Sequence, residues 1–277
     1  TSFGALPPRE AIDPATLAAN PEAPEAGARK VLYHRGDANQ AAAVVAWPAG
    51  SGLAQVREGR QLEILGQLMM NRLFDEMRER AGASYAPQVR VDWPNDDVGG
   101  GTIIALAQLR PDDIPAFYAA ADEIARDLAT TGPTADELAR VTEPLRQTIL
   151  RATTGNGFWM WQLRGSTRDP SRIGVIRTLL DDYSMTTPDR MKALAAKYLE
   201  AREPLEIAII PEGTDLPEGG FCKGRSTAGK EQLGLRARNA IASRFAYANR
   251  SNQKEHSAMA SQWSPDSWTK FEAKHLP

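Results

Sequence analysis

The sequence NRLFDEMRERAGASYAPQV, residues 71–89, joins a long helix to a strand. A helical pattern reaches it from Val56, because apolar residues recur there at steps of three or four: Leu62, Leu65, Met69, Leu73 and Met77. Gly82 supplies the helix stop, since glycine adopts positive φ at little cost. The corner places Arg78 near the end of the helix and Tyr85 at the start of the strand.

Apolar runs on both sides of this corner predict a sheet. Residues 29–35 and 40–48 read as strands joined by a GDAN turn, and the second is apolar throughout, which favours a central position. Further strands are predicted at 84–93, 101–109 and 205–211. Helices are predicted at 56–80, 111–130, 134–153, 156–163, 170–182 and 188–200. Because strands and helices alternate irregularly, the sequence predicts an α+β fold: a mixed or antiparallel sheet with helices packed on one face.

Helix ends and faces carry their own signals. Thr134 and Glu137 have the spacing of a capping box, and Thr187 before Pro188 is typical of an N-cap followed by a first-turn proline. Pro144 marks a point where the predicted helix at 134–153 can kink. The helix at 111–130 is expected to bury Ile114, Phe117, Ala121, Ile124 and Leu128.

Bulk composition excludes several classes of protein. The 277 residues are 42% hydrophobic and 25% charged, with a formal charge of −2, so nothing favours nucleic acid or an anionic membrane as a partner. No run of eighteen apolar residues occurs, so we expect no membrane span. The single cysteine, Cys222, excludes an internal disulfide.

Motif searches predict no metal or nucleotide site in this chain. His34, His256 and His275 are scattered, and neither H-x-x-E-H nor C-x-x-C occurs, so we expect no zinc here. The glycines at 99–101 lack the Gly-Lys-Ser/Thr of a phosphate loop. We expect His34 to be a packed or surface residue. The aromatic group Phe158, Trp159 and Trp161 is expected to belong to the core or to a domain interface.

Arg78 and Tyr85 remain as candidates for chemistry. Arginine is a permanent cation with a planar fork of donors, and tyrosine offers a hydroxyl donor on a rigid ring. Two donors at one corner could grip a peptide carbonyl or stabilise an oxyanion. The alternative is a surface arginine paired with Asp75 or Glu79 beside a half-buried tyrosine.

The same corner closely resembles the C-terminal domain signature of the pitrilysin, or insulinase-type, zinc metallopeptidases. Met77-Arg78-Glu79, then Ala81-Gly82, then Tyr85 seven residues after the arginine match that signature and its spacing. Four further segments are similar in the same order: HRGDANQAAAVVAWP (34–48), PTADELARV (133–141), NGFWMWQL (156–163) and TTPDRMKALAAKYL (186–199).

The resemblance implies a role as well as a fold. It is nearest to large bacterial members with four homologous domains, of which this would be the fourth. It implies a non-zinc domain that closes a chamber over a peptide and lends Arg78 and Tyr85 to substrate and transition-state binding. Zinc is expected on a partner domain, in the same polypeptide or another subunit, so this chain alone should not cleave peptides. The family also implies a periplasmic or cell-envelope location.

Two other functions stay open: a non-catalytic scaffold or interaction subunit of the same fold, and an unrelated α+β binding domain. We expect residues 1–27 to be the end of a preceding domain and a linker, because a proline-rich run opens the chain, and residues 28–213 to be the pitrilysin-type domain. Residues 214–277 hold ten Lys/Arg and six Asp/Glu with weak periodicity. This tail is expected to be a non-native extension, since the run from Met259 resembles the start of class II DAHP synthases. The alternative is a basic tail that docks a partner.

Overall fold

The computed structural model describes residues 26–81, 87–95 and 100–221, which all lie in the unit formed by Thr1–Gly229. Its strands are β1 (Arg29–His34), β2 (Ala41–Pro48), β3 (Gln88–Asp92), β4 (Thr102–Leu109) and β5 (Leu205–Pro211). Its helices are α2 (Val56–Ala81), α3 (Ile114–Thr130), α4 (Ala135–Ala152), α5 (Asn156–Gln162), α6 (Ser171–Arg177), α7 (Leu179–Ser184) and α8 (Pro188–Ala195). A π-helical turn, η4 (Ala196–Glu200), extends α8.

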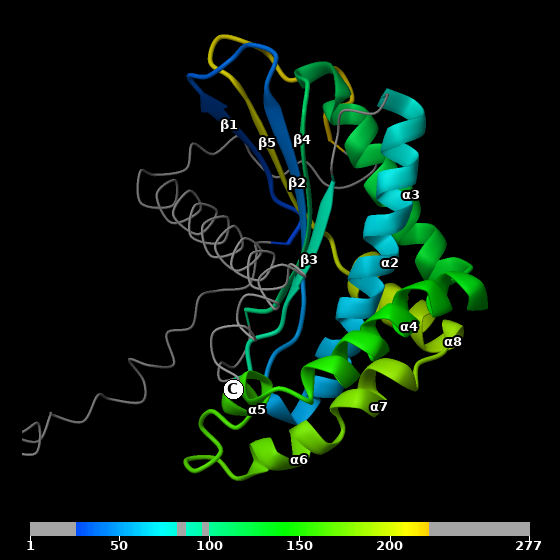
Figure 1. The fold of residues 1–277 in the computed structure, drawn as a ribbon. Helices are drawn as coiled ribbons and strands as arrows, with labels where there is room; N and C mark the ends of the chain where they lie inside the picture. Colours follow the sequence, from blue (N-terminus) through cyan, green and yellow to red (C-terminus); the bar gives the residue numbers. More distant parts are fainter. Residues whose placement is uncertain (1–25, 82–86, 96–99, 222–277) are drawn as a thin grey trace, which may run out of the picture. The chain divides into compact units, whose positions relative to one another are not determined.

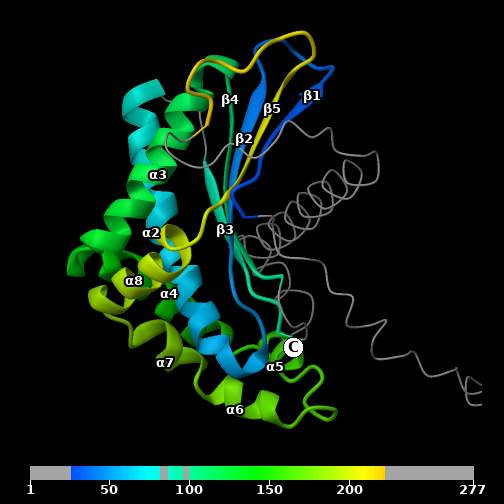
Figure 2. The same ribbon diagram turned by 180° about the vertical axis from the view of Figure 1, so that it is seen from behind.

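The strands form one mixed sheet in the order β1-β5-β2-β4-β3. Only β1 and β5 pair in parallel; the other neighbours in this sheet are antiparallel. The apolar strand β2 occupies the centre, as predicted. The described helices cover one face of the sheet, which both views show (Figures 1 and 2). The predicted α+β fold is confirmed.

The core lies between this face and the helices. Alternate residues of β2, namely Ala43, Val45 and Trp47, face α2 and α3 and are at most 1% exposed. The predicted stripe of α2 is at most 1% exposed at all five positions, and the predicted face of α3 is also buried. Each large apolar side chain buried in this way contributes about 1.5–3 kcal/mol. The helical periodicity therefore located the side of each helix that meets the sheet.

The predicted helix ends are also observed. Thr134 accepts from the backbone N–H of Glu137, whose carboxylate accepts in turn from the backbone N–H of Thr134, so the capping box is complete. Thr187 caps α8 by accepting from the backbone N–H of Arg190. The helix α4 is continuous through Pro144.

The prediction of a single helix at 170–182 was wrong. Two short helices, α6 and α7, meet there at Thr178. At the break the carbonyl of Val175 accepts from the Arg60 guanidinium (2.9 Å) and from the Thr178 hydroxyl (3.3 Å). These side-chain donors come partly from α2, far away in sequence, so the periodicity of 170–182 contains no sign of them. Within the described ranges, no helix has the length and apolarity needed to cross a bilayer.

An arginine on α2 ties three helices together. Arg72 donates to both carboxylate oxygens of Glu137 on α4 (2.8 and 3.0 Å) and to Asp127 on α3 (2.6 Å). It also reaches the carbonyl of Gly132, in the turn between those helices (3.3 Å). A two-pronged arginine–carboxylate contact of this kind fixes geometry better than a single charge pair.

This contact predicts a loss of stability in acid. Hydrogen bonding from Arg72 lowers the pKa of Glu137 from 4.5 to about 2, against an opposing effect of burial. A carboxylate with a depressed folded-state pKa stabilises the fold fully above about pH 4.5, and this stabilisation is lost as the pH falls through about 2. We expect Glu137→Gln to cost about 1 kcal/mol at pH 7, a value discounted for partial exposure.

Urea denaturation at several pH values measures this effect. The difference between wild type and Glu137→Gln should shrink steadily between pH 4.5 and 2. Glu200→Gln, an exposed change on η4, is the matched control and should leave the free energy of unfolding unchanged. A Glu137→Gln difference that stays constant over that range would show that the ion pair contributes nothing.

Candidate functional site

Arg78 lies in the last turns of α2, on the side away from the core. Its neighbour Met77 is fully buried at 0% exposure, while Arg78 itself is exposed. Within the described part of the chain, Arg78 makes no ion pair or side-chain hydrogen bond with Asp75 or Glu79. The guanidinium is therefore presented to solvent from a fixed helix, and the predicted alternative of a local salt bridge is not observed.

The other half of the predicted corner, Gly82 and Tyr85, lies outside the described residues. The chain is described again from Pro87, and β3 pairs with β4 from Gln88, opposite Leu106. The separation of Arg78 from Tyr85 therefore stays a prediction from their spacing.

The opposite end of α2 is anchored by charged side chains. The Glu58 carboxylate accepts from Arg190 (3.1 Å) and Lys197 (2.5 Å), and also from the Tyr198 hydroxyl. Arg60 is 7% exposed and donates to Asp182 on α7 (2.7 Å). Together with Arg72 in its middle, these contacts hold α2 along its length, and a functional side chain on such an element is well positioned.

The described residues do not fit a zinc site. No group of three His, Cys, Asp or Glu side chains is placed to hold a metal ion anywhere in the described ranges. Both ring nitrogens of His34 have local partners: Nδ1 accepts from the N–H of Gly36 (2.9 Å), and Nε2 donates to the carbonyl of Gln40 (2.7 Å). His34 thus stabilises the turn between β1 and β2.

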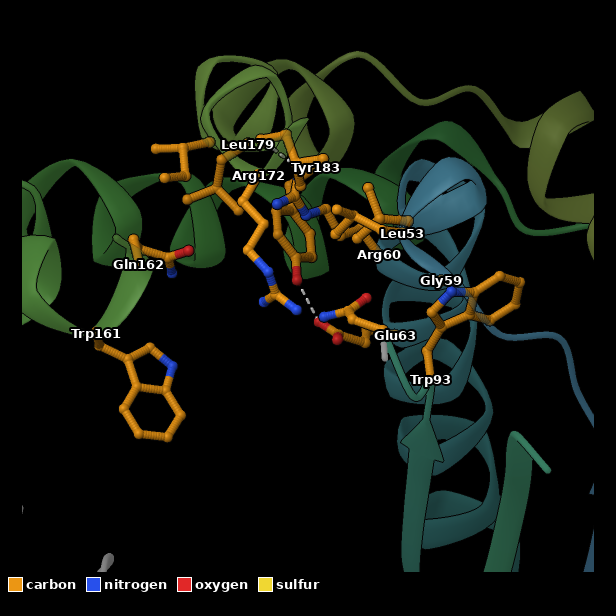
Figure 3. Close-up of a pocket in the computed structure, with 14 residues that line it drawn as sticks. Leu53, Gly59, Arg60, Glu63, Trp93, Trp161, Gln162, Arg172, Leu179 and Tyr183 are labelled. Carbon is orange, nitrogen blue, oxygen red and sulfur yellow. Dashed lines mark hydrogen bonds between the residues drawn. The ribbon is translucent and has the colours of Figure 1, made fainter. Parts of the chain in front are cut away.

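A recess of about 290 Å³ opens near the N-terminal end of α2 (Figure 3). Its lining comes from α2, from α5 to α7 and from the segment after β3. Its polar side chains include Arg60, Glu63, Gln162 and Arg172, and its aromatic side chains are Trp93, Trp161 and Tyr183. Glu63 and Arg78 lie about 22 Å apart along the helix axis, at about 1.5 Å per residue, so this recess is separate from the predicted corner.

One wall of the recess is held rigidly. The indole of Trp93 donates to the carbonyl of Gly52 (3.1 Å) and its ring lies over Gly59 and Gly50. A Cβ at either glycine would come within 2.4 Å of that ring, well inside normal contact. Gly59 is therefore required within α2, at the usual cost of glycine in a helix, because Trp93 occupies the space of a side chain.

Glu63 and Tyr183 meet at the back of the recess. The Tyr183 hydroxyl donates to the Glu63 carboxylate, as Figure 3 shows. Burial raises the pKa of Glu63, although the Tyr183 hydrogen bond and the charge of Arg60 oppose the rise. Burial and the nearby Glu63 charge raise the pKa of Tyr183, so the hydroxyl stays protonated and acts as a donor.

The aromatic group of α5 was predicted to belong to the core or to a domain interface, and the assignment to the core is wrong for two of its three residues. Trp159 is 41% exposed and Trp161 is 69% exposed, so neither belongs to the core of the described unit, whereas Phe158 packs against the core. The recess residues carry no local motif, since Tyr183 lies 120 positions after Glu63. The aromatic run around Trp161 is the part of this recess that stands out in the sequence.

Sequence comparison identifies the family. A profile of the peptidase M16 inactive domain matches residues 1–145, just over half of the chain, which include Arg78 and Tyr85. The chain belongs to the peptidase M16 inactive-domain family, the non-zinc C-terminal domain of pitrilysin-type proteins, and the resemblance read from the corner is confirmed. No curated protein matches the chain significantly.

Solved structures of low sequence identity share the fold. The peptidase M16 inactive domain from Pseudomonas fluorescens has a TM-score of 0.57 and 17% identity over 72% of this chain and 46% of its own. The periplasmic protease PqqL from Escherichia coli has a TM-score of 0.55 and 11% identity over 67% of this chain and 20% of its own. A chain of complex III from Candida albicans has a TM-score of 0.52 and 9% identity over 70% of this chain and 48% of its own. The chain thus spans less than half of each of these relatives.

Proposed function

We propose that this chain is the substrate-binding, chamber-closing domain of a zinc-dependent peptidase, with the zinc site on another domain. Arg78 and Tyr85 contribute donors to the peptide and to the oxyanion that forms during hydrolysis. The observation that carries the proposal is Arg78 itself: an exposed guanidinium at the end of a well-anchored helix, with neither neighbouring acid as a partner. Membership of the M16 inactive-domain family supports this role.

The two donors suit the chemistry of peptide hydrolysis. A tetrahedral intermediate carries its charge on one oxygen, and each preorganised donor aimed at that oxygen lowers the barrier. Arginine supplies such donors at every physiological pH, because it stays protonated. When the donors sit on a separate domain, they reach the substrate only after the domains close, so hydrolysis depends on closure.

The partner is a domain that carries H-x-x-E-H, in the same polypeptide or in a second subunit, as in bacterial members of the family. The Pseudomonas fluorescens and Escherichia coli relatives are longer than this chain, which supports the presence of such a further domain. A periplasmic or cell-envelope location is part of the proposal, supported by the likeness to a periplasmic protease.

Reconstitution tests the proposal. Mixed with the zinc-bearing half from its own gene neighbourhood or polypeptide, the chain should restore hydrolysis of a fluorogenic peptide, and neither half should be active alone. Peptide hydrolysis by this chain in the presence of a chelator would contradict the proposal. A zinc-bearing half that works as fast alone as in the mixture would also contradict it.

A non-catalytic scaffold of the same fold is the second candidate. The observation that favours it is the likeness to a chain of complex III from Candida albicans, in which this fold is part of a large assembly. In that case the reconstituted pair would be inactive, and the chain would instead copurify in a stable complex.

A further inference from the structure

The carboxylate of Glu63 faces the recess, near the guanidinium of Arg172 (Figure 3) and within the electrostatic influence of Arg60. Each arginine in the lining has a carboxylate partner: Arg60 contacts Asp182 at 2.7 Å, and Arg172 lies 3.9 Å from Asp169. Among the described residues, no basic side chain forms an ion pair with Glu63, and its hydrogen-bond partner is the neutral hydroxyl of Tyr183. Burial raises the pKa of this carboxyl, and the Tyr183 hydrogen bond and the charge of Arg60 offset the rise only in part.

Glu63 nevertheless stays accessible from the recess. Its side chain is exposed, and only one of its two oxygens, Oε2, accepts from Tyr183. The second oxygen is therefore free to accept from a molecule that enters the recess.

Aromatic faces flank the entrance to this carboxylate. Trp161 stands opposite Glu63 across the recess, and Trp93 lies on the α2 side (Figure 3). Trp161 is 69% exposed, while Trp93 is fixed by its bond to Gly52. Indole faces attract cations through their quadrupole, and tryptophan does so best of the aromatic side chains.

We infer that the recess binds a lysine or arginine side chain of a peptide, with the cation on the Glu63 carboxylate and its aliphatic stem against the exposed ring of Trp161. The unused carboxylate oxygen matches the charge of such a side chain, the Tyr183 hydroxyl holds the carboxylate in place, and the indole of Trp161 matches the apolar stem. The site is remote from Arg78, so it acts independently of the proposed role in hydrolysis.

The arginines of the lining do not favour an anion instead. Arg60 is buried and already donates to Asp182 and to the carbonyl of Val175, and Asp182 is shared with Arg57 (3.6 Å). An incoming carboxylate would meet Glu63 as a like charge. A cation removes the cost of that crowded charge, whereas an anion adds to it.

Titration of the whole chain, without any zinc-bearing half, tests the inference. The probe is acetyl-Gly-Lys-Gly-amide, followed by the indole N–H resonances of Trp161 and Trp93 in two-dimensional NMR spectra. We expect these resonances to shift, and the Nε-acetyl-lysine version of the peptide to bind at least tenfold more weakly, because it has no charge. Raising the salt concentration should weaken binding by the lysine peptide.

Two variants and two controls separate the contributions. Glu63→Gln should weaken binding about tenfold, since the charge-assisted hydrogen bond becomes neutral, and Trp161→Ala should weaken it about threefold. Glu200→Gln and Met160→Ala are matched controls at exposed positions outside the recess, and both should bind as wild type does.

The inference is overturned if the acetylated peptide binds as well as the charged one. It is also overturned if acetyl-Gly-Glu-Gly-amide binds more tightly, or if folded Glu63→Gln binds like wild type. Should Glu63→Gln fail to fold, Trp161→Ala decides, because Trp161 lies at the surface and outside the core cluster. Unchanged binding by that variant contradicts the site. None of these readouts depends on peptide hydrolysis, so failure here leaves the proposed function untouched.

Discussion

Arg78→Ala, combined with the zinc-bearing half, is expected to lower kcat/KM for peptide hydrolysis by about 10²–10³-fold. The reason is that the variant removes a preorganised donor that acts most strongly on the charge formed in the transition state. Tyr85→Phe should cause a loss of similar order, because it removes one hydroxyl donor and keeps the ring. The double variant should lose less than the product of the two, since donors to one oxygen act as a unit.

Arg140→Ala is the control for this prediction. Arg140 is exposed on α4 and, like Arg78, carries a guanidinium, but its partner is the neighbouring surface residue Asp136. Its loss should leave kcat/KM unchanged. Equal effects of Arg78→Ala and Arg140→Ala would mean that general surface charge, and not a positioned donor, matters for hydrolysis.

Asp182→Ala is expected to have the largest effect on stability, about 3–5 kcal/mol. Asp182 is 2% exposed and accepts from Arg60 (2.7 Å) and from the Thr178 hydroxyl (3.0 Å). Its removal leaves the guanidinium of Arg60 buried without a counter-charge between α2 and α7. Removing one partner of a buried ion pair destabilises a protein strongly, because the other charge stays buried alone. Replacing both partners by apolar residues of similar size often costs little or nothing.

Asp181→Ala tests whether position or charge is responsible. Asp181 is the preceding residue in the same helix turn but is exposed, so its loss should change the free energy of unfolding by about 0.5 kcal/mol or less. Urea denaturation of the three proteins gives the comparison. If Asp182→Ala is no less stable than Asp181→Ala, the buried ion pair does not anchor α7 to α2.

Periodicity and capping residues were sufficient to predict most of the fold. The stripe of α2, the central place of β2 and the Thr134 capping box depend on neighbours in sequence, and all of them are observed. The break between α6 and α7 could not be predicted in this way. It depends on Arg60, which lies 115 positions before the carbonyl that it contacts.

The two candidate sites also differ in how far they depend on residues that are distant in sequence. Arg78 could be predicted because a short signature surrounds it, and the structure places it on the exposed side of α2. The recess joins Glu63, Trp93, Trp161 and Tyr183, which come from four separate segments. Helix packing brings these residues together, so their spacing in the sequence could not predict the recess. Gly59 was a weak clue, since glycine within a helix requires a reason, and the ring of Trp93 provides one.

Inhibition by a phosphinic peptide, a stable tetrahedral analogue of the reacting amide, tests the central proposal most directly. In the reconstituted pair, Arg78→Ala should weaken this inhibitor by the same factor as it lowers kcat/KM, about 10²–10³, while KM for the substrate changes little. That result would place Arg78 on the transition state. An inhibition constant that is unchanged by Arg78→Ala, together with a raised KM, would contradict the proposal and leave Arg78 as a contact for the unreacted peptide alone.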